Sequence, residues 1–223
     1  MIIDFRLRPP VGGFLNTLMY SAGERRDGFT RTVGFEPSPA AQRQSMDLLL
    51  DEMNAAKIDR GVVVGRLAGV LGSVSNEDVR GIVAGHPDRF IGAASIDPAD
   101  RRKACRTISQ AVEEGFRLIN IEPGSYPVPM YADDRRLYPI YGHCEDIGVP
   151  VIMMVGGTAG PDLSYSDPIR TDRVLTDFPN LNVVVAHGGW PWVNEILHLA
   201  SDGRIYGCLP TCTFPACPAG KNT

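Results

Sequence analysis

Residues 133–157 read DDRRLYPIYGHCEDIGVPVIMMVGG, and this stretch decides the fold class. Its spacing of apolar residues predicts a helix over 136–147, and Gly148 is the residue type that commonly ends a helix. An apolar run over 150–155 follows and predicts a strand. A strand that is apolar on both faces is typical of a parallel sheet covered by helices. The stretch therefore predicts one helix–strand unit of a parallel α/β fold.

The same alternation continues in both directions along the chain. Further strands are predicted over residues 2–7, 61–65, 90–96, 116–121 and 181–186. Further helices are predicted over residues 40–56, 76–85, 101–114, 168–178 and 191–200. Right-handed crossovers between such strands allow either a doubly wound sheet or a closed barrel.

The positions of polar residues separate these two architectures. No Gly-x-Gly-x-x-Gly motif follows the first strand, which argues against a dinucleotide-binding sheet. Polar or special residues instead follow every predicted strand, as in a barrel whose site is built from all the strand ends. We therefore predict an α/β fold, a (β/α)8 TIM barrel that is incomplete, with six strand–helix units and the start of a seventh strand at 204–206.

The chain divides into a barrel region and a tail. The barrel occupies residues 1–206 and contains one long loop, 9–39, which is rich in Gly, Pro and Arg and is expected to lie over the barrel mouth. Residues 207–223 form an aberrant tail without apolar periodicity. Two interpretations of the tail are open: a reading frame shifted near residue 206, or a natural short variant. Both leave the barrel open between strands one and seven, which predicts low stability or association into a homo-oligomer.

The composition limits the class of partner. The 223 residues carry a net charge of −4, with 43% hydrophobic and 22% charged residues, which suits one α/β domain. No basic footprint for nucleic acid is present. The sequence has no secretory segment and no apolar run near the roughly 20 residues of a membrane helix. We therefore expect a cytoplasmic protein with a small-molecule partner.

Two arginines follow the first predicted strand at i, i+2 spacing. In a strand this spacing points Arg6 and Arg8 to the same side. If that side is the barrel interior, two guanidinium groups meet there and suit a substrate carboxylate or phosphate. The alternative is a structural network in which they pair with Asp4 or Glu122. Arg66, after the second strand, is a candidate third cation of the same substrate-binding pocket.

Candidate catalytic and binding groups also follow strands four and six. His187 ends strand six before two glycines and is a candidate acid–base residue or hydrogen-bond donor; the alternative is a buried core histidine. Asn120 is a candidate substrate-binding residue at the end of strand four. Glu122 is either a catalytic base or a structural partner of arginine. Trp190 is a candidate wall of the substrate pocket, or a packing residue at the start of a helix.

Three segments together resemble a known family. They are Ile3-Asp4, the stretch 133–157 quoted above, and LNVVVAHGGWPWVNEILHLA at 181–200. They are similar to the amidohydrolase-related family, which includes enzymes like aminocarboxymuconate-semialdehyde decarboxylase and dihydroxybenzoate decarboxylase. The resemblance covers residues 1 to about 206. It implies a (β/α)8 barrel with one divalent metal such as zinc, which hydrolyses or decarboxylates small carboxylates or rings.

The resemblance also implies where metal ligands would lie. The family's His-x-His after strand one is Arg6-Leu7-Arg8 in this chain, and its histidine after strand five is Met154. The histidine after strand six is present as His187. Arginine has no lone pair to give and stays protonated, so we expect no metal bound in the family's way.

The functional expectation combines these observations. The resemblance implies a hydrolase, decarboxylase or lactonase that acts on a small carboxylate-bearing metabolite. With most of the metal site lost, we expect this chain itself to be inactive. Two alternatives stay open: a barrel that binds anions without turnover, and a truncated product without function.

Overall fold

The computed structural model describes residues 1–157, 160–201, 203 and 205–207. Strands and helices alternate throughout this part of the chain. The predicted tail, 207–223, lies outside the described residues from 208 onward.

The strands and helices have the following bounds. The strands are β1 Ile3–Leu7, β2 Arg60–Val64, β3 Phe90–Ser95, β4 Leu118–Ile121, β5 Val151–Met154, β6 Val183–Ala186 and β7 Ile205–Gly207. The α-helices are α1 Leu18–Ser21, α2 Gly23–Thr32, α3 Pro39–Arg43, α4 Met46–Ala55, α5 Asn76–Gly85, α6 Arg101–Glu113, α7 Tyr138–Asp146, α8 Pro168–Asp177 and α9 Val193–Ser201. Short 3-10 helices are η1 Gly12–Asn16, η2 Gly69–Leu71, η3 Pro123–Ser125, η4 Leu163–Ser166 and η5 His187–Gly189.

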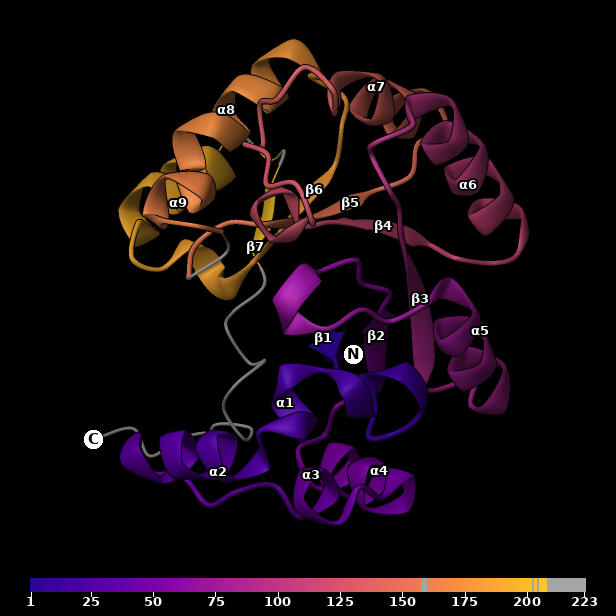
Figure 1. Ribbon diagram of the computed structural model, residues 1–223, viewed down its shortest axis with the longest axis vertical. Coiled ribbons are helices and arrows are strands. Elements are labelled where there is room, and N and C mark those ends of the chain that lie inside the picture. The colour runs from indigo at the N-terminus through magenta and orange to yellow at the C-terminus, as the bar shows by residue number, and fades with distance from the viewer. Residues whose placement is uncertain (158–159, 202, 204, 208–223) are drawn as a thin grey trace.

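One curved sheet of seven parallel strands forms the centre of the molecule. The strand order follows the sequence, and each strand pairs in parallel with the next. Figure 1 shows α5 to α9 following one another around the outside of this sheet. Sequential parallel strands with outer helices are the architecture of a (β/α)8 barrel, so the predicted fold is confirmed. Within the described residues, β7 and β1 are not paired with each other.

The sheet is buried on both faces, which explains its uninterrupted apolar strands. One set of side chains fills the barrel interior: Val62, Val64, Ala93, Leu118, Ile152, Met154, Val184 and Ala186. Alternate residues on the same strands, such as Val63, Ile119 and Val185, pack among the surrounding helices. Full burial of one such side chain contributes about 1.5–3 kcal/mol, so packing across both faces is the main stabilisation of the barrel.

Most predicted helix boundaries are confirmed because they depend on local capping. The helix α5 begins where the Ser75 hydroxyl accepts a hydrogen bond from the Asp78 backbone at 3.0 Å. Gly115 and Gly148 follow α6 and α7 with φ values of 97° and 68°, the left-handed conformation in which helices commonly end. No helix in the described part of the chain is long and apolar enough to cross a lipid bilayer.

The helix predicted over 40–56 is divided into α3 and α4. Gln44 adopts a left-handed φ of 50° and ends α3. Ser45 then caps α4, because its hydroxyl accepts a hydrogen bond from the Leu48 backbone at 3.3 Å. Apolar side chains continue on both sides of the break, so periodicity alone could not reveal it.

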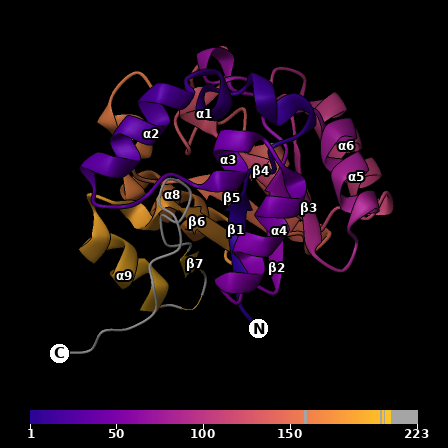
Figure 2. The ribbon, with the colours of Figure 1, turned by 90° about the horizontal axis from the view of Figure 1, so that it is seen from below.

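The segment 9–39, predicted as one long loop after the first strand, is largely helical. It contains η1, α1 and α2. The sequence of α2, GERRDGFTRT, is mostly polar and lacks an apolar stripe, so no apolar periodicity was present from which a helix could be predicted. Figure 2 shows α1 and α2 on the side of the molecule opposite the N-terminus, which is the side where the strands end.

Candidate functional site

A bulge in β1 turns Arg6 into the barrel. Between Asp4 and Leu7, three residue steps on β1 match two steps on β2. Phe5 packs in the barrel interior and Leu7 packs among the outer helices, so a regular strand would point Arg6 outward. The extra residue of the bulge lets Arg6 point inward as well. The Arg6 backbone N–H donates to Asp4 Oδ1 at 3.0 Å within this bulge.

The guanidinium of Arg6 contacts side chains at the ends of three other strands. Nη2 donates to Glu122 Oε1 at 2.5 Å. Nη1 lies 2.8 Å from His187 Nε2 and 3.2 Å from Met154 Sδ. Glu122 follows β4, Met154 ends β5 and His187 follows β6. The pairing of Arg6 with Glu122 is the structural network that the sequence left open as an alternative.

Glu122 is the centre of a buried ion-pair network. Arg66 donates to its second oxygen, Oε2, from Nε at 2.9 Å and from Nη2 at 2.8 Å. Burial by itself raises the pKa of Glu122, but the charges of Arg6 and Arg66 outweigh burial and lower the pKa to about 2. Glu122 is therefore ionised at neutral pH and is a weak base. Its geometry fits the positioning of two guanidinium groups better than proton transfer.

Backbone contacts hold the partners of Glu122 in place. The backbone of Arg66 exchanges two hydrogen bonds of 2.8 Å with Val74, which pins the loop after β2. The Asn120 amide donates to the Gly65 carbonyl at 2.9 Å and to Glu122 Oε1 at 3.2 Å. Asn120 Oδ1 is buried without a hydrogen-bond partner among the described residues. Such an acceptor suits a water molecule or a hydrogen-bond donor of a ligand.

His187 has an uncommon backbone conformation. Its φ is 68°, and Gly188 and Gly189 after it also have positive φ. Non-glycine residues held in this region cluster at functional sites. Because arginine can only donate, His187 Nε2 accepts from Arg6 and the neutral ring carries its proton on Nδ1. Burial lowers the pKa of His187, and Arg6 and Arg8 lower it further, to about 4.

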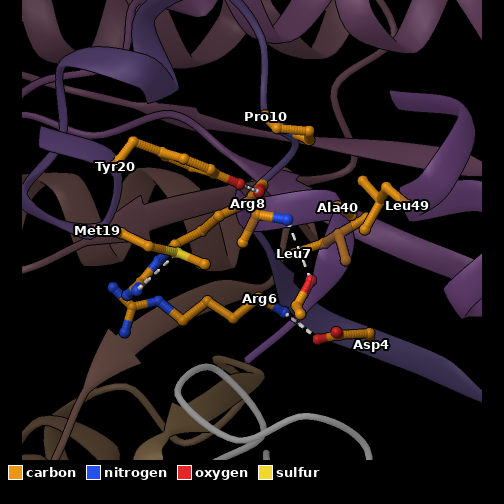
Figure 3. A pocket seen from close by; sticks show the side chains of 11 residues that line it. Asp4, Arg6, Leu7, Arg8, Pro10, Met19, Tyr20, Ala40 and Leu49 are labelled. Atoms are coloured by element: carbon orange, nitrogen blue, oxygen red, sulfur yellow. Dashed lines mark hydrogen bonds between the residues drawn. The ribbon is translucent and has the colours of Figure 1, made fainter. Parts of the chain in front are cut away.

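Arg8 lies beside a pocket of about 90 Å³, shown in Figure 3. Its Nη1 is 3.8 Å from Met19 Sδ, and its backbone carbonyl accepts a 2.6 Å hydrogen bond from the Tyr20 hydroxyl. Figure 3 shows the Arg6 and Arg8 side chains running in the same direction from β1. Both also line a smaller space with Arg66, about 10 Å³, which has room for about one water molecule.

The structure adds site residues that the sequence analysis did not single out. Phe14 and Thr17 line the smaller space, and Met19 and Tyr20 line the larger one. No sequence motif in residues 14–20 indicates that this segment folds back onto β1. Trp190, in contrast, is 65% exposed and lines neither of these two spaces.

The donor set does not fit the divalent metal that the family resemblance implies. A zinc site needs several lone-pair donors around one cation. Among the residues that the structure describes, no group of three or more His, Cys, Asp or Glu side chains could hold a metal ion. The lone pairs of Glu122, His187 and Met154 do converge, but they face the guanidinium of Arg6. The chemistry of this site is therefore that of arginine, carboxylate and imidazole.

Known proteins show similarity over much of this chain. The amidohydrolase family model matches residues 3–218. An uncharacterised TIM-barrel protein from Bordetella bronchiseptica is 52% identical with a TM-score of 0.87, over 92% of this chain and 74% of that chain. A curated relative, 2-amino-3-carboxymuconate-6-semialdehyde decarboxylase from Dictyostelium discoideum, is 28% identical over 131 residues, 51% of this chain and 36% of that protein. The match thus spans about a third of that relative's length.

More distant solved structures share the fold. The 4-oxalomesaconate hydratase from Rhodopseudomonas palustris is 20% identical with a TM-score of 0.59, over 94% of this chain and 74% of that chain. The 2,6-dihydroxybenzoate decarboxylase from Rhizobium is 16% identical with a TM-score of 0.54, over 84% of this chain and 66% of that chain. Because the family model matches nearly every residue, the chain belongs to the amidohydrolase family.

Proposed function

We propose that this chain acts in an enzyme that hydrolyses or decarboxylates a small carboxylate-bearing metabolite. The observation that carries the proposal is the gathering of three arginines, one carboxylate and one imidazole at the strand ends of an amidohydrolase barrel. Strand ends are where barrel enzymes hold their catalytic groups. The curated relative is itself named as a decarboxylase of a carboxymuconate compound, which supports the same chemical class.

Arg8 is the guanidinium that we assign to the substrate carboxylate. Arg8 lines both the larger pocket and the smaller space, and its guanidinium reaches Met19, which also lines the larger pocket. The hydrogen bond from Tyr20 to the Arg8 carbonyl fixes the backbone from which the side chain extends. A planar guanidinium can bind a carboxylate through two parallel hydrogen bonds, which orients the substrate as well as attracting it.

His187 and Asn120 are assigned to the reacting end of the substrate. With its proton on Nδ1, the neutral imidazole donates a hydrogen bond to the oxygen on which negative charge develops. In hydrolysis, a water molecule attacks the carbonyl carbon that this donor polarises. In decarboxylation, the bond to the leaving carboxylate breaks, its electron pair stays on the substrate carbon, and a water molecule supplies the proton. Asn120 Oδ1 can accept a hydrogen bond from that water.

Carboxylate binding provides the first test of this proposal. Acetate, benzoate and citrate are titrated into the purified protein, and the melting temperature and heat of binding are measured. We expect at least one of them to raise the melting temperature, and Arg8→Gln to remove the increase. Arg43→Gln, which changes an exposed arginine on α3, is the matched control and should keep it. If no carboxylate stabilises the unaltered protein, the proposal is wrong.

A barrel that binds anions without turnover is the second candidate. The imidazole lone pair of His187 faces Arg6, and the Glu122 carboxylate is paired with two arginines, so neither is a strong base. Carboxylate binding that Arg8→Gln abolishes, without any hydrolysis or release of carbon dioxide, favours this candidate. Turnover of any carboxylate that binds favours the enzyme.

A further inference from the structure

We infer that the smaller space between Arg6, Arg8 and Arg66 binds one monoatomic anion, a halide such as chloride. The inference rests on the size, the charge and the hydrogen-bond donors of this space. Neither Met154 nor His187 lines it. The inference goes beyond the proposed function, because it needs no carboxylate substrate and no turnover.

The size of the space limits what can enter it. Its volume of about 10 Å³ has room for about one water molecule. A carboxylate brings at least three non-hydrogen atoms and a phosphate brings five, so neither fits, whereas a chloride ion is only slightly larger than water. The apolar walls include Phe14 and Val74, which are 2% and 1% exposed, and such packed side chains cannot move apart without repacking the core. The ligand is therefore a water molecule or a single ion.

The charge of the lining favours an anion. Three guanidinium groups and one carboxylate, that of Glu122, line the space, which gives three positive charges, one negative charge and a net charge of +2. Arginine stays protonated at every physiological pH. The side chains of Arg6 and Arg66 are only 3% and 12% exposed, so bulk water screens them poorly. Buried charges need counter-charges close by, and one halide ion would supply a second negative charge beside Glu122.

The donors in the lining favour a ligand that only accepts hydrogen bonds. Each oxygen of Glu122 already accepts two, Oε1 from Arg6 and Asn120 and Oε2 from two nitrogens of Arg66. Within the part of the chain that the structure describes, Arg6 Nε and Arg66 Nη1 donate to no acceptor. A halide ion can accept from several such donors at once. A water molecule would also have to direct its own two hydrogens, and the three cations beside it oppose this.

The test compares chloride with methanesulfonate, a larger anion without a carboxylate, at equal ionic strength. For the unaltered full chain, we expect sodium chloride to raise the melting temperature by about 2–4 °C relative to sodium methanesulfonate, the shift that a ligand at a few times its dissociation constant gives in a protein of this length. The chloride NMR line should broaden in the presence of the protein and narrow again when bromide is added.

Two variants locate the ion. Val64→Ile adds one methylene group to the wall of the space and should abolish both chloride responses. Val62→Ile makes the same change two residues earlier on β2, in the barrel interior but outside the lining, and should keep both. Arg66→Gln removes one charge and its donors without adding volume and should also abolish the responses, whereas Arg43→Gln, at an exposed position on α3, should keep them.

Two outcomes would overturn the inference. One is an equal melting temperature in the two salts together with an unbroadened chloride line for the unaltered protein. The other is a chloride response that persists in folded Val64→Ile or in Arg66→Gln, because the ion would then be bound elsewhere; if Val64→Ile does not fold, Arg66→Gln decides alone. None of these measurements includes a carboxylate, so the inference and the proposed function can fail separately.

Discussion

Replacement of Glu122 by glutamine is the sharpest test of the buried network. The substitution keeps the size of the side chain and one acceptor oxygen, so it opens no cavity. It removes the one carboxylate that faces both Arg6 and Arg66, whose side chains are only 3% and 12% exposed. The two guanidinium groups are then left close together and without a counter-charge on Glu122.

The pKa of Glu122 sets the size of the expected effect. A fall from its usual value of 4.5 to about 2 corresponds to about 3 kcal/mol, at about 1.4 kcal/mol for each pKa unit. This agrees with the loss of about 3–5 kcal/mol that follows when one partner of a buried ion pair is removed. We therefore expect Glu122→Gln to lower the free energy of unfolding by about 3 kcal/mol at pH 7.

Urea unfolding followed by circular dichroism measures this loss. The midpoint should fall without a change in the slope, because the surface exposed on unfolding is unchanged. Glu36→Gln makes the same chemical change at an exposed position and should alter stability by less than about 0.5 kcal/mol. If Glu122→Gln is no more destabilising than Glu36→Gln, the network does not stabilise the fold and our account of the site is wrong.

Two further predictions follow from pH and from backbone conformation. The folded pKa of Glu122, about 2, lies below its usual 4.5, so the stability that ionised Glu122 contributes is complete above pH 4.5 and is lost as the pH falls towards 2. The urea midpoint of the unaltered protein should therefore fall over this range, and that of Glu122→Gln should fall less steeply. The folded pKa of His187, about 4, also lies below its usual 6.5, so stability should fall as the pH is lowered from 6.5 to 4. A urea midpoint that stays constant from pH 7 to 3 would contradict both pKa assignments. Gly156→Ala should cost about 1–3 kcal/mol more than Gly115→Ala, because both have φ above 90° but only at Gly156 would the new methyl group collide, 2.6 Å from the Trp190 carbonyl oxygen. Equal losses of unfolding free energy in the two variants would show that the close approach of Gly156 to Trp190 does not constrain the side chain at position 156.

The barrel could be predicted from sequence because its signals are local or periodic. The parallel strands are buried on both faces, so each appears in the sequence as an apolar run. The ends of α5 and α7 depend on Ser75 and Gly148, which act within a few residues of their own position. The divided helix at Gln44 and the helices within 9–39 were missed, because in both places the apolar pattern does not follow the backbone.

The candidate site could be predicted only in part. The sequence indicated that Arg6, Arg66, Asn120, Glu122 and His187 follow parallel strands, and the structure brings all five to one end of the barrel. It could not rank the alternatives for Arg6, because pairing with Glu122 and binding of a substrate need the same residue type at the same strand end. The sequence also could not show that the side chain of Trp190 is exposed.

By itself, the sequence determined the parallel barrel, most helix ends and membership of the amidohydrolase family. Burial pattern, capping and motif similarity each depend on residues that are close together in the sequence. The tertiary structure alone decided that Arg6 turns inward, because that direction depends on a bulge in the pairing of β1 with β2. It also decided which lone pairs Arg6 meets, since its contacts with Glu122 and His187 join residues 116 and 181 positions apart. Contacts across such separations are set by closure of the strands around a common axis, which no local pattern records.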